Sequence, residues 1–223
     1  MEYKVKTYEE AIKVVEEIGL LPLAPLIPGF PSLHGITSPD SWHSDTELDP
    51  WIWRTKFPTD GIAGYGKFMK KKSILVSRQL LPYVKKVLGY TESVEDRYFD
   101  GMVSKEALTI YKLIRQEEGI DTRVLRKKSG LTHKDQKKLF ENALLELQGT
   151  MDIVISGIQE KKNIEGEKNG WSSTAFETYD SWASRNKIER IDMEKEAARD
   201  YLLGHFKEVS SEESVKSLRK ILS

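Results

Sequence analysis

Apolar residues recur with helical spacing through the middle of the chain. Between Ser104, a predicted N-cap, and Gly119, a predicted stop, they fall at i, i+3, i+4 and i+7, namely Ala107, Ile110, Tyr111 and Ile114. A shorter helix is expected between Asp121 and Gly130. The pattern therefore predicts two consecutive helices joined by a short connection.

A third helix and two strands are expected next. Thr132 and Asp135 have the spacing of a capping box, and Gly149 ends an apolar stripe of Phe140, Ala143, Leu144 and Leu147. Met151, Ile153 and Ile155 alternate with the polar Asp152 and Ser156, and with the run WSSTAFETY they predict two strands around the polar loop QEKKNIEGEKNG. Three helices followed by a hairpin predict a winged helix-turn-helix module over residues 104–180.

The N-terminal region shows similar local signals. Thr7 and Glu10 form a capping box for a helix over residues 7–18 that ends at Gly19. The stretch LLPLAPLIPGFP carries four prolines and is expected to be extended. Helices are expected to start at Ser38-Pro39-Asp40 and Asp49-Pro50, and a hairpin with the basic tip Lys70–Lys72 is expected within residues 62–77.

Shorter helices are predicted from Leu80 and after Ser93, and two more near the C-terminus. One of these covers residues 188–203 with Gly204 as terminator, and the other follows Ser210 or Ser211. The expected fold class is α+β and mainly helical, with short β-hairpins. We divide the chain into an N-terminal region (1–103), the winged module (104–180) and C-terminal helices that pack on the rest (181–223), and we expect these parts to form one compact unit.

Composition narrows the classes of function. The 223 residues contain 35 basic and 35 acidic side chains and no cysteine, which excludes disulfides and thiolate chemistry. None of the four histidines lies in a metal-binding spacing, and no nucleotide-binding loop is present, so we expect neither a metal nor a cofactor. Because the N-terminus has no apolar signal segment and no apolar run is long enough to span a membrane, a cytoplasmic location is expected.

Positive charge is concentrated locally. From Arg123 to Lys138 there are seven basic side chains and one acidic side chain, a net charge of about +6, in the part of the module that contacts DNA in helix-turn-helix proteins. The candidate nucleic-acid contacts are Arg123, Arg126, Lys127, Lys128, Thr132, His133, Lys134, Lys137, Lys138, Lys161, Lys162 and Lys168. The alternative is that these lysines form the solvated face of an amphipathic helix.

A second concentration of polar and aromatic groups lies in residues 40–54. His43, Asp45, Glu47 and Asp49 are the candidates for acid–base chemistry, although Asp49 also suits an N-cap. Trp42, Trp51 and Trp53 are candidate groove aromatics on which a base could stack. Since Trp51 and Trp53 are two residues apart in an expected helix, only one of them is expected in the core.

The order of several short motifs resembles the AlkZ-like (YcaQ-like) family of bacterial DNA glycosylases, and in particular the AlkZ-related proteins. These motifs are the first helix ending in Gly19-Leu20-Leu21, then DPWIWR, GYGKF with SRQLLPYV, and ALLELQGTMDIV before a tryptophan-bearing wing. The resemblance covers residues 8–205 and implies a tandem winged-helix fold. It also implies a basic surface for duplex DNA.

The chain departs from this family at its reactive residues. Family glycosylases carry Gln-x-Gln or Gln-x-Asp directly after the first helix, and here these two positions are Pro22 and Ala24. Neither side chain can activate water. We therefore expect a non-catalytic protein that binds duplex DNA. The alternatives are a glycosylase-like enzyme with a relocated acidic site and a scaffold that binds a protein partner through its aromatic, proline-rich N-terminal surface.

Overall fold

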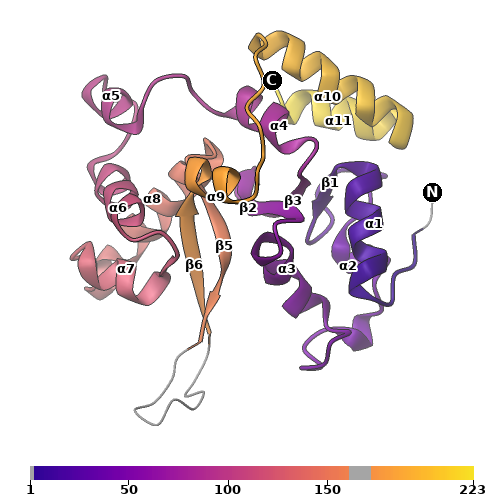
Figure 1. Ribbon diagram of the computed structural model, residues 1–223, viewed down its shortest axis with the longest axis horizontal. Helices are drawn as coiled ribbons and strands as arrows, with labels where there is room; N and C mark the ends of the chain where they lie inside the picture. The colour runs from indigo at the N-terminus through magenta and orange to yellow at the C-terminus, as the bar shows by residue number, and fades with distance from the viewer. Residues whose placement is uncertain (1–2, 161–171) are drawn as a thin grey trace.

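The computed structural model describes residues 3–160 and 172–223 (Figure 1). Over these residues the fold is α+β and mainly helical, with two small antiparallel three-stranded sheets. The predicted fold class is confirmed at this level. No described helix has the length and apolar character that crossing a membrane requires.

The first group of elements begins with the predicted N-terminal helix. Its members are α1 (Tyr8–Ile18), β1 (Leu20–Pro22), α2 (Leu33–Ile36), η1 (Pro39–Ser41), α3 (Pro50–Thr59), β2 (Ala63–Met69) and β3 (Lys72–Ser77). Thr7 and Glu10 form the capping box of α1, and Gly19 ends the helix in the left-handed conformation at φ 76°. A Cβ at Gly19 would lie 2.1 Å from Leu80, so glycine also permits close packing there.

Helices α4 (Leu81–Leu88) and α5 (Val94–Phe99) lead into a second group of elements. Its members are α6 (Lys105–Gln116), β4 (Ile120–Asp121), α7 (Thr122–Lys128), η2 (Lys134–Gln136), α8 (Lys137–Gly149), β5 (Ile153–Gln159) and β6 (Ser173–Thr178). Apart from the short η turns, both groups run helix, strand, helix, helix, strand, strand. In both sheets the last strand, β3 or β6, lies in the centre.

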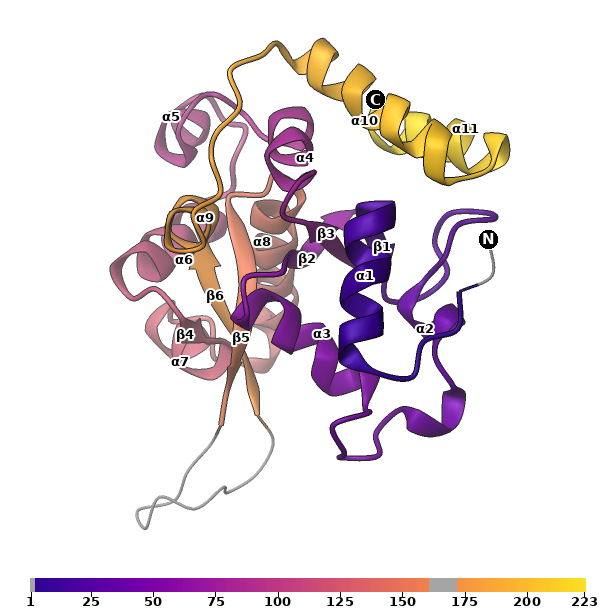
Figure 2. The same ribbon diagram turned by 45° about the vertical axis from the view of Figure 1, so that its right-hand side comes forward.

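Three helices complete the chain: α9 (Tyr179–Arg185), α10 (Lys195–Val209) and α11 (Glu212–Ile221). The last two form a hairpin that lies beside α4 and α1 in both views of the ribbon (Figures 1 and 2). The rings of Tyr83 on α4 and Tyr201 on α10 are stacked with their centroids 4.1 Å apart. This contact fixes the C-terminal hairpin on the N-terminal half.

A single hydrophobic cluster runs through both groups and α9–α11. Trp182 of α9 is fully buried, and its indole N–H donates to the carbonyl oxygen of Pro58 on α3 at 3.0 Å. Strand β5 packs against α3 at Gly157, where an added Cβ would lie 2.8 Å from Oγ1 of Thr59. The core is thus continuous across residues 103/104 and 180/181, where the sequence predicted domain boundaries. The division into domains stays a prediction.

Several element predictions were wrong in detail. The N-terminal α2 and the two-residue β4 had not been expected, and Ser38-Pro39-Asp40 opens only the 3₁₀ turn η1. The capping box before α8 is formed by His133 and Gln136 rather than Thr132 and Asp135. Each of these elements is short enough that one local hydrogen bond or one strand pairing determines it.

The C-terminal prediction needs the largest correction. Residues 188–194 are not helical, α9 had not been expected, and α10 continues through Gly204. An interior glycine costs a helix about 1 kcal/mol relative to alanine. Leu202, Leu203 and Phe206 are buried on either side of it, and their burial outweighs that cost.

Candidate nucleic-acid interface

The basic segment of the sequence folds into α7, a turn and α8. Asp121 caps α7 by accepting hydrogen bonds from the backbone N–H groups of Arg123 and Val124. Leu125 and Phe140 are buried and anchor the two helices on the core, so the cationic side chains lie on the outside. We call this surface the basic face; it consists of Arg123, Arg126, Lys127, Lys128, Lys134, Lys137 and Lys138.

Arg126 holds the turn between the two helices. Its Nε donates to the carbonyl oxygen of Leu131 at 2.9 Å, and its Nη2 donates to those of Thr132 and His133 at 3.4 and 3.2 Å. The guanidinium therefore caps the turn by satisfying three carbonyls at once. Thr132 and His133 are exposed immediately before α8, where the sequence placed them as possible base contacts.

Other cations of the basic face are paired with carboxylates. The pairs are Arg123 with Asp121, Lys128 with Glu117, and Lys137 with Glu141. In contrast, Lys127, Lys134 and Lys138 are exposed and form no hydrogen bond or ion pair with any residue that the structure describes. These three ammonium groups are available to an anionic ligand.

The hairpin of β5 and β6 extends from the body of the molecule beside α7 (Figure 1). Nη2 of Arg123 donates to the carbonyl oxygen of Gln159 near the end of β5 at 3.3 Å, which connects α7 to this hairpin. The predicted wing lysines, Lys161, Lys162 and Lys168, lie outside the described residues. The two predicted strands are present as β5 and β6, and both the wing and the role of its lysines stay predictions.

The third basic spot, Lys70–Lys72, is confirmed as the tip of the β2–β3 hairpin. Lys70 and Lys71 have positive φ angles of 49° and 59°, the geometry of the tight turn that joins two strands. Near this end of β2, the backbone N–H of Lys67 donates to the side chain of Gln148 on α8 at 2.9 Å. The two groups of elements are thus joined by a partly buried hydrogen bond.

Asp49, a candidate for acid–base chemistry, is completely buried and has a structural role. Its Oδ1 accepts hydrogen bonds from the backbone N–H groups of Trp51 at 2.8 Å and His43 at 3.0 Å, and its Oδ2 accepts one from Asp45 at 3.3 Å. It caps α3 and holds the preceding loop, in which His43 and Asp45 have positive φ. Of the other candidates, His43, Asp45 and Glu47 are exposed.

The three candidate groove aromatics occupy different environments. Trp53 is 1% exposed and donates to the carbonyl oxygen of Glu47, so it belongs to the core and not to a groove. Trp51 is 42% exposed, as the two-residue spacing predicted for one of the pair. Its ring lies between His43, at 4.9 Å, and the guanidinium of Arg54, at 3.6 Å, while Trp42 is partly buried near His34.

The two positions that correspond to family glycosylase residues lie at the end of β1. Pro22 is buried and pairs with Ile74 of β3, whereas Ala24 is exposed just beyond the strand. Neither supplies a hydrogen-bonding side chain. The strand pairing of Pro22 is antiparallel and at the edge of the sheet, where proline is tolerated.

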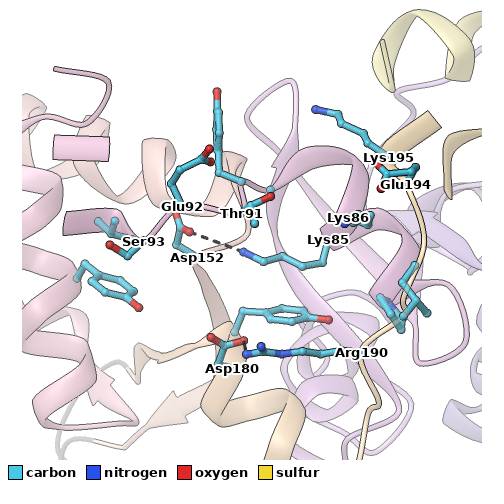
Figure 3. Close-up of a pocket in the computed structure, with 17 residues that line it drawn as sticks. Lys85, Lys86, Thr91, Glu92, Ser93, Asp152, Asp180, Arg190, Glu194 and Lys195 are labelled. Atoms are coloured by element: carbon cyan, nitrogen blue, oxygen red, sulfur yellow. Dashed lines mark hydrogen bonds and ion pairs between the residues drawn. The ribbon is translucent and has the colours of Figure 1, made fainter. Parts of the chain in front are cut away.

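Sequence reasoning missed a polar cavity of about 630 Å³ among α4, α9 and the segments around them (Figure 3). On its floor, Asp152 lies 2.7 Å from Nη2 of the buried Arg97 and 3.7 Å from Nζ of Lys85. Lys85 also donates to the carbonyl oxygens of Thr150 and Met151 at the end of α8. No sequence motif marks this cluster, because its members come from three separate elements.

Lys85 gives the stability a dependence on pH. Burial lowers the pKa of its ammonium group below the usual 10.5, and the nearby Asp152 opposes that shift. Between the lowered pKa and 10.5 the unfolded chain binds more protons at this group than the folded chain, so its contribution makes stability rise with pH. We expect this rise to disappear in Lys85→Met when unfolding by urea is compared with wild type across that range. An unchanged pH slope in the variant would show that Lys85 titrates normally.

Comparison with known proteins assigns the chain to a family. The profile of the family described as "AlkZ related" matches residues 5–223, nearly the whole chain. Searches of curated proteins and of solved structures find no match. Within the part of the chain that the structure describes, no cluster of three or more metal-ligating side chains is present. With this match over almost its entire length, the chain belongs to the AlkZ-related family.

Proposed function

We propose that this protein binds duplex DNA through the basic face and the β5–β6 hairpin, without catalysing base excision. The observation that carries the proposal is the set Lys127, Lys134 and Lys138, three exposed ammonium groups with no partner among residues 3–160 and 172–223. Membership of the AlkZ-related family, which is named for a DNA glycosylase, makes DNA the first polyanion to consider.

The proposal includes a tandem winged-helix architecture. In the second group, α7 and α8 are joined by a turn and followed by a two-stranded hairpin, which is the order of a helix-turn-helix with its wing. The first group repeats the same order and the same strand arrangement. In such a module α8 would be the recognition helix, and its exposed N-terminal half carries Lys137 and Lys138.

The charge distribution supports binding despite a formal net charge of zero. Each phosphate that a lysine or arginine neutralises releases condensed counterions, and a local set of cations is sufficient for this effect. Arg123 and Arg126 are fixed by hydrogen bonds to backbone carbonyls, so they are partly ordered before any ligand arrives. Preorganised cations lose less conformational entropy on binding.

Two features of the chain argue against base excision. Pro22 and Ala24 offer no group that can position or activate a water molecule. The alternative acidic site would have to use Asp49, whose carboxylate is buried and accepts three backbone hydrogen bonds. Asp45 and Glu47 are exposed, without the desolvation that tunes a catalytic carboxylate.

The test replaces Lys127, Lys134 and Lys138 together by alanine. We expect wild type to bind duplex DNA of any sequence with a logarithmic affinity that falls linearly with the logarithm of salt concentration. The triple variant should bind about tenfold more weakly at low salt, with a salt slope smaller by about 1 for each lysine removed. Fluorescence anisotropy with a labelled duplex at several salt concentrations measures both quantities.

The matched control removes the same charge elsewhere. Lys207, Lys216 and Lys220 are exposed on α10 and α11, and their replacement by alanine should leave the affinity within a factor of about two of wild type and the salt slope unchanged. Equal weakening by the two triple variants would indicate a general charge effect and reject the basic face. Absence of DNA binding by wild type at low salt would reject the proposed function itself.

A further inference from the structure

Negatively charged residues are also concentrated in one segment of the sequence, which is separate from the basic segment. Between Lys13 and Arg54 the sequence contains no lysine or arginine and six carboxylates, four of them within residues 40–49. In Figure 1, α7 lies on one side of the β5–β6 hairpin, and the segment before α3 that holds residues 40–49 lies on the other side. The chain is therefore neutral overall but has one locally basic and one locally acidic segment.

The acidic segment also presents apolar side chains. Leu48, Trp51 and Ile52 are 51%, 42% and 39% exposed. Asp40, Asp45 and Glu47 are exposed beside them along the chain and form no ion pair with the residues that the structure describes. We call these six residues the acidic aromatic surface.

This surface is held rigid by the residues beneath it. Asp49 fixes the loop through three backbone N–H groups. The indole of Trp53 donates to the carbonyl oxygen of Glu47 at 2.7 Å, and that of Trp42 donates to Oγ1 of Thr37 at 2.9 Å. An exposed tryptophan in the first turn of a helix whose N-cap is fixed, as Trp51 is in α3, is the kind of anchor that dominates protein interfaces.

Cationic groups on neighbouring elements do not neutralise the surface. Arg54 is stacked on the ring of Trp51, and Lys56 is paired with Asp60. Lys4 and Lys6 flank Val5, which pairs with Thr37 before η1. The carboxylates of Asp45 and Glu47 thus face solvent without a fixed counter-charge from the described residues.

We propose that the acidic aromatic surface docks a positively charged segment of a partner protein, one that carries arginine or lysine next to apolar side chains. Charge complementarity selects this occupant: DNA phosphates would be repelled by the same carboxylates that attract a basic segment. Trp51 and Ile52 supply the apolar contact, and Asp40, Asp45 and Glu47 supply the charge. The proposal goes beyond DNA binding and does not depend on it.

The probe is a short synthetic peptide with arginine and leucine on one helical face, titrated into the ¹⁵N-labelled full chain. We expect saturable shifts of the indole N–H signal of Trp51, while that of the buried Trp182 stays nearly fixed. The variant Asp40→Asn, Asp45→Asn, Glu47→Gln should bind the peptide about tenfold more weakly, and Trp51→Ala at least as weakly. A peptide with glutamate in place of arginine should not bind.

The matched control neutralises three exposed carboxylates elsewhere, Asp192→Asn, Asp200→Asn and Glu208→Gln, and should bind the peptide like wild type. The proposal would be overturned if the control variant lost as much peptide affinity as the charge variant, or if the charge variant bound the peptide like wild type. NMR shifts located on the basic face would also overturn it. Self-association that the charge variant abolishes would also overturn it, because the occupant would then be a second copy. DNA binding, measured on the same variants, should not change, so failure here and failure of the DNA proposal are distinguishable.

Discussion

Replacing Arg97 by methionine is expected to lower the free energy of unfolding by about 3–5 kcal/mol. The Arg97 side chain is 2% exposed, and its Nη2 lies 2.7 Å from Oδ1 of Asp152, which is 9% exposed. Without the guanidinium, the carboxylate of Asp152 would keep only Lys85, at 3.7 Å, as a nearby counter-charge among the residues that the structure describes. A carboxylate that is 9% exposed and loses its closest counter-charge is costly because water reaches it only from the cavity and does not supply the missing positive charge.

A double-mutant cycle separates this cost from lost packing. Asp152→Asn alone leaves Arg97 buried without a carboxylate and should also destabilise, whereas Arg97→Met with Asp152→Asn should recover part of the loss. Urea denaturation of the four proteins gives the coupling free energy. If the two single losses simply add, the ion pair contributes nothing and the cost of Arg97→Met arises from its shape alone.

This cluster marks the limit of what the sequence predicts. The alternation of Met151, Asp152 and Ile153 indicates a half-buried strand with a solvated aspartate, but Asp152 lies before β5 and faces a buried arginine. Arg97 belongs to a six-residue helix with no distinctive spacing. A tertiary ion pair between residues 55 positions apart leaves no periodic signal in one sequence.

Local signals, in contrast, predicted well. The capping box of Thr7 and Glu10, the N-cap Ser104 and the proline after Asp49 were each recognised from a few adjacent residues, and the structure confirms the helix starts. Their energetics are contained within one helical turn. The extent of α10 depended instead on packing against α4, and a sequence pattern that stopped at Gly204 could not include that contact.

In the candidate site, too, local features were predictable from the sequence and long-range contacts were not. The basic segment was visible as charge density, and its exposure on α7 and α8 follows from the amphipathic pattern. Which lysines are free depended on long-range partners: Lys128 is neutralised by Glu117, eleven residues earlier, whereas Lys127 next to it has no such neighbour among the described residues. The sequence indicated that Asp49 could serve either as an N-cap or in acid–base chemistry, but it did not indicate that the side chain is completely buried.

Replacing Asp49 by alanine is the second large effect that we expect, a loss of about 2–4 kcal/mol in unfolding free energy. The carboxylate caps α3 and accepts hydrogen bonds from three backbone N–H groups, those of Trp51, His43 and Asp45. Removal of an N-cap costs about 1 kcal/mol, and hydrogen bonds to a charged group contribute about 1.5–3 kcal/mol. Because the site is fully buried, water cannot take the place of the carboxylate.

Asp49→Asn distinguishes this structural role from catalysis. Asparagine keeps one carbonyl oxygen in the position of Oδ1 and is a good N-cap, so we expect it to lose about 1 kcal/mol and to remain folded. If Asp49 were the base of a relocated glycosylase site, the folded Asp49→Asn protein would lose an abasic-site activity that wild type shows on alkylated DNA. We expect instead that wild type leaves a panel of alkylated duplexes intact, and that Asp49→Asn binds undamaged duplex as wild type does. Abasic sites formed by wild type and not by Asp49→Asn would make the carboxylate catalytic and the non-catalytic proposal wrong.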